Sequence, residues 1–394
     1  MSVSRIVQAI SQYGPTSRAS VAKITGLSKQ TVSEIVSGLE ENGWVRTVGR
    51  TEGHVGRRAV VYEISPDAAA VASVDLGGFK VRVAICNLTG VVVAETVRPT
   101  DRAGGEAVVR QIAELIRSTT KQAGLNAEKV RSAVVGVPGA PDPKTGRIRM
   151  VPNIPGLDRI DVSRLLQESL GIETVVENDV NLAALGEHWL TRRGENDDLV
   201  YVSIGTGIGA GLVVGGQLLR GSFGTAGEVG YLPFGTDPFD EESKKAGALE
   251  RVAASLAIIE KYSSLTGITK SVPEVFDAAS NGDKAATQTL EFVARQIARA
   301  LAAIVSVVDP SCIVIGGSIG SRDELLNLVV RFLPECFPRP IRIEKSLLGH
   351  HAAIAGGAAV ALSRLHLAVF AGGMTEVEFA VPPPEIDRFV SAAA

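Results

Sequence analysis

Apolar residues in the first forty positions recur at the three- to four-residue spacing that places them on one face of a helix. They fall into three short segments whose side chains are expected to share a small core: Ile6, Ile10, Val21, Ile24, Leu27, Val32, Ile35, Val36 and Leu39. Gly14 and Pro15 end the first segment, and Gly26 separates the second from the third. Ser17 and Ser28 can cap the second and third helices. The pattern predicts a helix-turn-helix arrangement.

Two strand-like runs follow and flank a glycine-rich tip in residues 44 to 64, WVRTVGRTEGHVGRRAVVYEI. Such a hairpin is a wing, and arginines at its tip can reach a phosphate backbone or a narrow minor groove. On the third helix, amide and hydroxyl side chains outside the apolar face can contact base edges, and a lysine can contact phosphate. The candidate DNA contacts are Lys29, Gln30, Thr31, Ser33, Ser37, Arg57 and Arg58.

The distribution of charge bears on this interpretation. The alternative is an ordinary small helical domain with a solvated basic face. The 394 residues carry a net charge of -3, yet residues 1–60 contain eight basic and four acidic side chains, which leaves -7 for the rest. A basic module on an acidic body suits phosphate contacts at one end only. We therefore expect a winged helix-turn-helix over residues 1–65 that binds double-stranded DNA.

Composition limits the remaining classes of protein. With 45% hydrophobic residues the chain can fill sizeable cores. Its N-terminus lacks a cationic segment followed by a long apolar run, and no stretch of about 18 uncharged apolar residues occurs, so we expect a cytoplasmic protein with no membrane partner. Cys86, Cys312 and Cys336 lie far apart, which indicates neither a disulfide framework nor a thiolate metal site.

From about residue 70, strand-like runs alternate with amphipathic helices, an order typical of α/β folds. One block begins with a strand, a glycine turn and a strand, AVASVDLGGFKVRVAICN, and a second begins in the same way, LVYVSIGTGIGAGLVV. This repetition predicts two related lobes with a cleft between them. We expect the lobes at 70–195 and 196–365, and a tail at 366–394 that is either loosely ordered or docked on the body.

Two glycine-rich turns, at 75–78 and 205–211, leave backbone N–H groups open to a phosphate. Thr206 adds a hydroxyl donor, and Asp75 is suited to hold a magnesium ion through water. A tight hairpin turn without a ligand explains either turn when it is taken alone. Asp179 stands where VENDVN passes from a strand to a helix, and its carboxylate can either take a proton from a substrate hydroxyl or cap the helix.

Seven motifs resemble those of the ROK family of sugar kinases and repressors, and they occur in the same order: DLGGFK, VGVPG, VENDVNLAALGE, SIGTGIGAG, GTAGEVGY, GALE and VIGGSIG. The resemblance covers about residues 70–365. With the winged helix in front, the chain looks like the family's repressors that answer to xylose, glucose or N-acetylglucosamine. It implies a two-lobed fold of the actin and hexokinase type, ribonuclease H-like, with a sugar or sugar derivative in the cleft. It also implies a homodimer or a dimer of dimers.

The resemblance assigns roles to individual residues. Asp179 is the equivalent of the family's catalytic base. The positions that match the sugar site are Gly139, Asn153, Asn178, Asp179, Glu228, Tyr231 and Glu250. The positions that match the phosphate loops and the nucleotide side are Asp75, Gly77, Gly78, Thr206, Gly207, Gly316 and Gly317.

Two departures from the family's pattern bear on chemistry. Its first phosphate loop reads D-x-G-G followed by Thr or Ser, whereas Phe79 stands here, which removes a hydroxyl and argues against turnover of Mg-ATP. Its zinc site uses a histidine and three cysteines. Tyr231 replaces the histidine, Ala248 replaces the last cysteine, and no cysteine lies between them. We therefore expect no structural zinc, no other metal and no required cofactor.

Three functional hypotheses follow. In the first, a dimer binds an inverted-repeat operator, and a sugar relieves repression. In the second, the chain is an ATP-dependent sugar kinase that also regulates. In the third, the body binds no small ligand and only dimerises or binds a partner. Phe79 and the missing zinc ligands weigh against the second hypothesis, and the retention of Asn178, Asp179, Glu228 and Glu250 weighs against the third.

Overall fold

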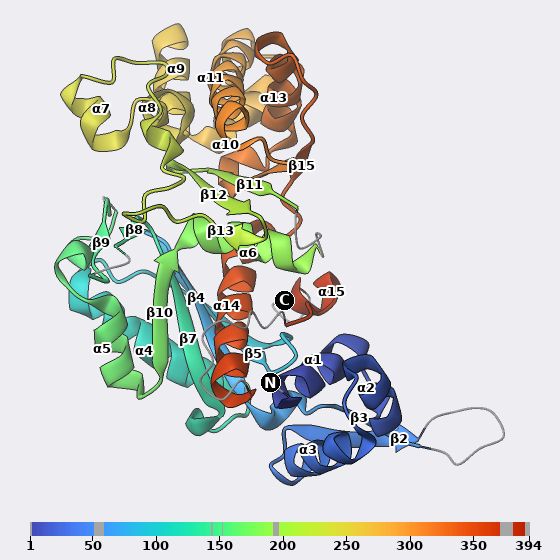
Figure 1. Cartoon of the computed structure of the whole chain (residues 1–394). Helices are drawn as coiled ribbons and strands as arrows, with labels where there is room; N and C mark the ends of the chain where they lie inside the picture. The colour runs from blue at the N-terminus through green and yellow to red at the C-terminus, as the bar shows by residue number, and fades with distance from the viewer. Residues whose placement is uncertain are drawn as a thin grey trace. The chain divides into compact units, whose positions relative to one another are not determined.

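The computed structural model describes residues 2–50, 59–142, 145–151, 153–191, 197–370 and 381–390. Its contacts divide the chain into two units (Figure 1): unit 1 is Met1–Asp179, Trp189–Arg192 and Ile354–Ala394, and unit 2 is Val180–His188 and Arg193–Ala353. Each unit combines helices with a five-stranded sheet, which confirms the predicted α/β class. The division by contacts runs differently from the boundaries expected from the sequence, because it groups the N-terminal module and the last helices with the first lobe.

The N-terminal module has three helices and an antiparallel sheet of order β1-β3-β2. Its elements are α1 (Ser2–Tyr13), β1 (Thr16–Ser17), α2 (Arg18–Thr25), α3 (Lys29–Glu41), β2 (Val45–Arg50) and β3 (Val60–Ile64). Both predicted caps are confirmed, since Ser17 and Ser28 each accept the backbone N–H three residues on, at 3.2 and 3.0 Å. Gly26 ends α2 with φ 69°, a conformation that glycine adopts without strain.

Ile24 is an exception to the predicted core. It is 44% exposed, because α2 buries the face that carries Val21, Ala22 and Thr25. Thr25 is buried in place of Ile24. Its hydroxyl donates to the Val21 carbonyl at 2.7 Å, and this hydrogen bond lets a polar side chain lie in the core.

The first lobe is built on a mixed sheet of order β10-β7-β4-β5-β6. Its elements are η1 (Pro66–Ala68), β4 (Ala70–Leu76), β5 (Lys80–Asn87), β6 (Val92–Pro99), α4 (Gly105–Gln122), η2 (Ala127–Lys129), β7 (Val130–Val137), β8 (Ala140–Pro141), β9 (Ile148–Arg149), η3 (Leu157–Arg159), α5 (Val162–Leu170) and β10 (Glu173–Asn178). Strands β4, β5 and β6 are antiparallel neighbours, whereas β7 runs parallel to β4 and β10 runs parallel to β7.

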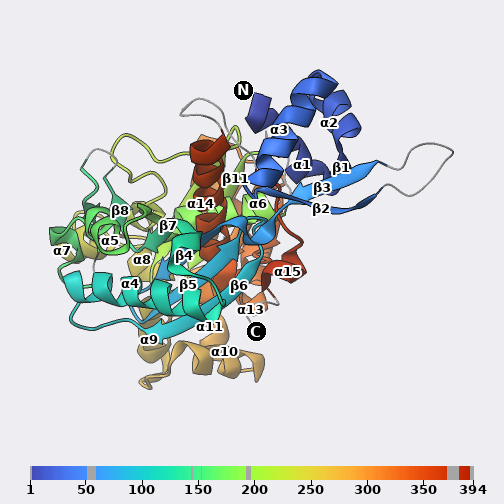
Figure 2. The ribbon, with the colours of Figure 1, turned by 90° about the horizontal axis from the view of Figure 1, so that it is seen from below.

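The two faces of this sheet bury different helices. Ala72 of β4 points into the apolar core formed with α4 and α5. The next residue, Ser73, points to the opposite face, as successive residues of a strand do, and its hydroxyl donates to the Ile354 carbonyl of α14 (Ala352–Phe370) at 2.8 Å. A Cβ on Gly357 would lie 2.2 Å from the Ser73 Oγ, so α14 lies close because glycine stands there. Helices α4 and α14 thus cover opposite faces (Figures 1 and 2).

Unit 2 contains a sheet of order β13-β12-β11-β14-β15. Its elements are α6 (Asp179–Leu190, all but its ends), β11 (Leu199–Ile204), β12 (Ile208–Val214), β13 (Gln217–Leu218), η4 (Val229–Tyr231), α7 (Glu241–Ala246), α8 (Glu250–Ala253), α9 (Ser255–Thr266), α10 (Val272–Ser280), α11 (Lys284–Val308), β14 (Cys312–Gly316), α12 (Gly317–Gly320), α13 (Asp323–Cys336), β15 (Ile343–Lys345) and η5 (Gly349–His351). Val202 and Ile315 face a core shared with α8, α9, α11 and α13. Helix α6 lies against β12, where a Cβ on Gly211 would come within 2.6 Å of the Ala184 Cβ.

The end of α14 is joined to the N-terminal module by aromatic side chains. Phe370 meets Trp44, which lies between α3 and β2, edge to face with ring centroids 5.2 Å apart. One turn earlier, His366 is fully buried and packs against the Phe370 ring at 5.4 Å. An aromatic pair of this geometry contributes about 0.5–1.5 kcal/mol beyond its area burial. The contact fastens the N-terminal module to α14.

By length and composition, one helix among the described residues could cross a membrane, Gly349–Phe370. Of its most apolar window, 61% is buried inside the protein, as befits a helix packed on a sheet. Arg364 interrupts the apolar run and donates to Glu173 of β10 at 3.3 Å.

Of the predicted tail, residues 366–370 belong to α14 and residues 381–390 are docked on unit 1. The Trp189 indole N–H donates to the Val381 carbonyl at 2.7 Å. Phe389, in the short helix α15 (Ile386–Val390), is fully buried and meets the Trp189 ring edge to face at 6.4 Å. For this stretch, docking is the correct one of the two alternatives that the sequence left open.

His366 should make stability depend on pH. Burial lowers the pKa of His366 to about 4, although a hydrogen bond with the Leu88 backbone acts in the opposite direction. The folded protein therefore holds a neutral ring, whereas the unfolded chain titrates near the ordinary value of 6.5. We expect this residue to reduce the free energy of unfolding by roughly 3 kcal/mol as the pH falls from about 6.5 to 4.

Urea denaturation across this pH range measures the effect. His366→Gln should flatten the pH dependence relative to the wild type, because Gln carries no titratable ring. Parallel curves for His366→Gln and the wild type would contradict the prediction.

Candidate functional site

The first turn of α3 is open to solvent. Lys29 and Gln30 are exposed, and the Gln30 amide donates to Glu34 at 3.0 Å. Thr31 is half-buried, and its hydroxyl lies 2.8 Å from that of Ser28, the cap residue. The N-terminal residues of a recognition helix are those that contact base edges in helix-turn-helix proteins. The structure therefore presents the predicted amide and lysine side chains at the end of the helix where such contacts are made.

The two predicted serines further along α3 are bonded to an arginine that the sequence analysis missed. Arg18, the first residue of α2, donates to the Ser33 Oγ at 2.9 Å and to the Ser37 Oγ at 3.0 Å. Its guanidinium also lies over the Tyr62 ring at 5.0 Å and 3.7 Å from the Glu40 carboxylate. These contacts fix α3 relative to α2 and β3. No spacing rule signals Arg18, because its partners stand on other elements.

Strands β2 and β3 pair antiparallel, with Val45 opposite Ile64 and Arg50 opposite Val60, as a wing requires. The predicted contacts at the tip, Arg57 and Arg58, lie outside the described residues. The wing is therefore supported by its strands alone.

In unit 1, three predicted sugar positions meet at the ends of neighbouring parallel strands. Asn178, the last residue of β10, donates through Nδ2 to the carbonyl of Gly139, which follows β7, at 2.8 Å. Gly139 has φ 99°, and a Cβ there would lie 2.4 Å from the Arg149 carbonyl oxygen, so only glycine fits. Asp179 follows at the start of α6 and is half-buried. Amide and carboxyl groups are thereby gathered at one edge of the sheet.

Asn153 joins this edge beside the first glycine turn. A Cβ on Gly78 would lie 2.9 Å from the Asn153 Cβ, so the two backbones approach closely. The turn itself is held by the Gly77 N–H, which donates to the Lys80 carbonyl at 2.9 Å, and by the Thr100 hydroxyl, which donates to the Gly77 carbonyl at 2.7 Å. A predicted phosphate position and a predicted sugar position, far apart in the sequence, are thus neighbours.

Two residues of this turn are poorly suited to phosphoryl transfer. Burial raises the pKa of Asp75, and the positive charges of Arg82 and Lys80 offset it only in part. Arg82 is itself engaged in a buried ion pair with Glu95. Because a carboxyl group must be ionised to bind a cation, a raised pKa weakens Asp75 as a magnesium partner. Phe79, in place of the family's hydroxyl residue, is 81% exposed.

In unit 2, Glu250 and Glu228 form the acidic part of the predicted sugar site. The Oε2 atom of Glu250 accepts the Ile208 N–H at 2.9 Å, and a Cβ on Gly207 would lie 2.6 Å from the same oxygen. Burial raises the pKa of both glutamates, and the charge of Glu250 raises that of Glu228 further. Carboxyl groups that retain a proton readily can both donate to and accept from sugar hydroxyls.

The predicted phosphate and nucleotide positions of unit 2 lie on two adjacent turns. They are Thr206 and Gly207, between β11 and β12, and Gly316 and Gly317, after β14. The turns are close because β11 and β14 are parallel neighbours, and a Cβ on Gly205 would lie 3.2 Å from the Ser318 Oγ. Gly317 has φ 82°, and a Cβ there would lie 2.3 Å from the Ile204 carbonyl oxygen. Both turns can adopt these conformations because glycine has no side chain.

Tyr231 stands at the position of the family's histidine. Its hydroxyl donates to the Lys245 carbonyl at 2.9 Å, which uses its one proton and leaves its lone pairs to accept from a ligand. Within the described part of the chain, no group of three or more His, Cys, Asp and Glu side chains is arranged to hold a metal ion.

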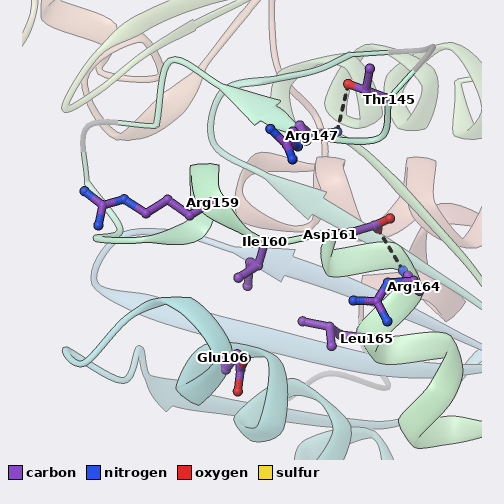
Figure 3. A pocket seen from close by; sticks show the side chains of 8 residues that line it. All are labelled: Glu106, Thr145, Arg147, Arg159, Ile160, Asp161, Arg164 and Leu165. Carbon is purple, nitrogen blue, oxygen red and sulfur yellow. Dashed lines mark hydrogen bonds between the residues drawn. The ribbon is translucent and has the colours of Figure 1, made fainter.

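A separate cavity of about 420 Å³ lies on unit 1 near the start of α5 (Figure 3). Its lining is Glu106, Thr145, Arg147, Arg159, Ile160, Asp161, Arg164 and Leu165. Asp161 caps α5 by accepting the Arg164 N–H at 2.9 Å, and the Arg164 side chain pairs with Glu168 at 2.7 Å. No predicted sugar or phosphate residue lines this cavity, so it is not part of the candidate site.

Comparison with known proteins supports both modules. Residues 71–364 match the model of the ROK family, and residues 4–46 match that of winged helix-turn-helix DNA-binding domains. The xylose repressor of Caldicellulosiruptor bescii is 26% identical over 368 residues, which cover 88% of this chain and 92% of the repressor. The DNA-binding transcriptional dual regulator NagC of Escherichia coli K12 is 27% identical over 381 residues, 92% of each chain. The glucokinase of Thermotoga maritima is 31% identical over 312 residues, 74% of this chain and 97% of the enzyme.

A solved structure extends the comparison to the fold. The crystal structure of a ROK family transcriptional regulator, a homolog of the E. coli MLC protein, matches with a TM-score of 0.76 and 23% identity. The match covers 94% of this chain and 97% of that chain. The resemblance seen in the sequence is thus confirmed for the winged helix and for the sugar-kinase-like body.

Replacing Glu228 tests whether this site residue lowers the stability of the folded protein. Since its pKa is raised, ionising it destabilises the folded protein above that pKa, and the penalty is absent below the ordinary glutamate value near 4.5. Glu228→Gln should therefore raise the free energy of unfolding at pH 7, and the gain should vanish by about pH 4. Chemical denaturation at the two pH values measures this. A variant less stable than the wild type at pH 7 would contradict it.

Proposed function

The chain belongs to the ROK family, and from this we propose that it is a sugar-responsive transcription regulator, most simply a repressor, acting in the cytoplasm. One observation carries the proposal: a helix-turn-helix with an exposed first recognition turn is joined in one chain to a body that keeps the amide and carboxyl positions of a sugar site. The xylose repressor and NagC resemble this chain over about nine-tenths of its length.

The effector that we propose is a sugar or sugar derivative. Asn178 and Asp179 belong to unit 1, and Glu228 and Glu250 belong to unit 2. Their amide and carboxyl groups make directional hydrogen bonds of the kind that discriminate hydroxyl patterns. A sugar bound by these groups would favour the conformation of the chain in which it makes more of these hydrogen bonds.

Helix α14 is the proposed route from the sugar to the DNA. The chain passes from unit 2 to unit 1 within this helix, between Ala353 and Ile354, and its last residue, Phe370, contacts Trp44 of the N-terminal module. A sugar can act through it only by binding two states unequally, typically by about 1–3 kcal/mol. In a dimer, two α3 helices would read half-sites about one helical turn apart or a multiple of that, so the operator should be an inverted repeat.

An ATP-dependent sugar kinase is the second candidate, favoured by the retention of Asp179 and of the glycine turns and by the similarity to a glucokinase. The raised pKa of Asp75 and the exposed ring of Phe79 count against it. A body without a small ligand is the third candidate, and the retained carboxyl groups of both units count against it.

The first experiment is retention of a labelled fragment from upstream of the protein's own gene at fixed salt and without ATP. D-xylose, D-glucose, N-acetyl-D-glucosamine and their phosphate esters are titrated in turn. We expect one of them to release the DNA without ATP, as a repressor relieved by a sugar requires. Retention that no member of the panel changes would count against the proposed sugar sensor.

Variants locate the response. Asp179→Ala should keep DNA binding and shift the releasing concentration of the sugar by at least about tenfold, as expected when a charged hydrogen-bond partner is lost. Asp158→Ala, at an exposed position of the same unit, is the matched control and should behave as the wild type does. A normal response in Asp179→Ala would exclude this carboxylate as an essential contact.

A kinase assay separates the first two candidates. With magnesium and ATP, we expect none of the panel sugars to stimulate ADP release by the wild-type protein, because Phe79 removes the family's hydroxyl group and the raised pKa of Asp75 weakens its hold on magnesium. The T. maritima glucokinase with glucose serves as the positive control. Sugar-dependent ADP release would instead favour the bifunctional kinase.

A further inference from the structure

The segment 228–250 ends in the two acidic residues of the predicted sugar site. The family resemblance implies that a zinc ion fixes this segment through a histidine and three cysteines, but the side chains here do not fit zinc. Tyr231 donates its hydroxyl to the Lys245 carbonyl, and Ala248 is a buried methyl group. The segment contains no thiol and no imidazole at all. Other interactions must hold it in place.

Polar side chains bridge the segment instead. The Arg251 Nη1 donates to the Asp240 Oδ2 at 2.9 Å and to the Ser243 Oγ at 2.7 Å. The Thr236 hydroxyl lies 3.1 Å from that of Ser243 and donates to the Ala248 carbonyl at 3.2 Å. Ser243 is buried, so these bonds also satisfy its hydroxyl. We name the following set the polar clasp: Tyr231, Thr236, Asp240, Ser243 and Arg251.

The backbone beneath the polar clasp is closely packed. The Leu249 N–H donates to the Gly230 carbonyl at 3.0 Å. Gly247 has φ 85°, and a Cβ there would lie 2.3 Å from the same carbonyl oxygen. Because Gly230 follows Glu228 closely and Leu249 precedes Glu250, this contact brings the two ends of the segment together.

Helix α8 links the polar clasp to the sugar site. Arg251 reaches from it toward α7, where it bonds to Asp240 and Ser243, whereas its neighbour Glu250 reaches to the Ile208 N–H at the start of β12. A loosened Arg251 would let α8 shift and would release the Glu250 carboxylate from Ile208. Asp240 is exposed and Arg251 is 30% exposed, so solvent screens their pairing, whereas the hydrogen bond from Arg251 to the buried Ser243 is shielded.

We infer that the polar clasp replaces the family's zinc ion and positions Glu228 and Glu250 for the sugar. The inference rests on the proposed function and identifies positioning residues of that same site. Arg251 is the centre of the polar clasp, because it holds Asp240 and Ser243 together through charge-assisted hydrogen bonds. The hydrogen bond from Arg251 is also the main cause that lowers the pKa of Asp240, so the pair is ionised at neutral pH.

The full-length Arg251→Ala variant tests the inference, with Lys244→Ala as the matched control. Lys244 pairs with Glu241 on the surface of the same helix α7 and is not part of the polar clasp. Hydrogen exchange without sugar is the first readout. Arg251→Ala should speed exchange in residues 228–250 and at the Ile208 amide, whereas Lys244→Ala should match the wild type. Exchange that Arg251→Ala leaves unchanged would overturn the inference.

Sugar affinity is the second readout, with the panel sugar that binds the wild type most tightly as the probe. Arg251→Ala should raise its Kd roughly tenfold, and Lys244→Ala less than about twofold. Against a Glu250→Gln background, which keeps an acceptor for Ile208, the effect of Arg251→Ala should shrink, because the two residues act in series. An effect of equal size in both backgrounds, or an unchanged Kd, would refute the positioning role.

Metal chelation gives a third readout and separates this inference from the proposed function. EDTA should leave the wild-type sugar Kd unchanged. A tightly held zinc ion whose removal weakens sugar binding would overturn the inference. If no panel sugar binds the wild type while Arg251→Ala still speeds exchange, the proposed function fails and the polar clasp stands as the device that holds the segment.

Discussion

The close contact between β4 and α14 is the constraint on which the arrangement of unit 1 depends. Ser73 donates its hydroxyl to the carbonyl of Ile354, and the absence of a side chain at Gly357 lets the helix lie against that hydroxyl. With its first turns fixed on the sheet, α14 presents Phe370 at a defined place, where Trp44 packs against it. Trp44 and the contacts of Arg18 set the orientation of α3. That orientation is thus tied to the sheet that contains β4.

The carboxyl groups of the candidate site oppose the stability that this packing provides. Burial raises the pKa of Glu228 and of Glu250, and for Glu250 it outweighs the hydrogen bond from Ile208 that acts the other way. Two buried carboxyl groups with raised pKa values lower the stability of the folded protein, so stability alone does not explain why both are present. Perturbed acids are enriched at functional sites for this reason. Asp75 differs, because the positive charges of Arg82 and Lys80 partly offset the rise in its pKa that burial causes. Its burial therefore fits a structural role as well as a catalytic one.

Features that depend on residues a few positions apart, such as helix caps, could be predicted from the sequence. Ser17 and Ser28 cap their helices as expected, because a cap and its N–H partner lie three positions apart. Arg18, the contact of Trp44 with Phe370 and the polar clasp could not be predicted, since each joins side chains that only the tertiary fold brings together. The site residues came from the order of motifs, but that order does not reveal that Gly78 and Asn153 are neighbours.

The contact of Phe370 with Trp44, made once in each subunit of the proposed dimer, has an energy of the size that the proposed signalling requires. Allosteric coupling between two ligands is typically worth about 1–3 kcal/mol, and an edge-to-face aromatic pair contributes about 0.5–1.5 kcal/mol. In the proposed dimer, a shift of α14 that breaks the contact of Phe370 with Trp44 in each subunit would change the free energy by an amount of that size. No large rearrangement of the N-terminal module is needed. In that proposal the module would only have to lose its fixed orientation, because two recognition helices bind two half-sites together only while both are held in register.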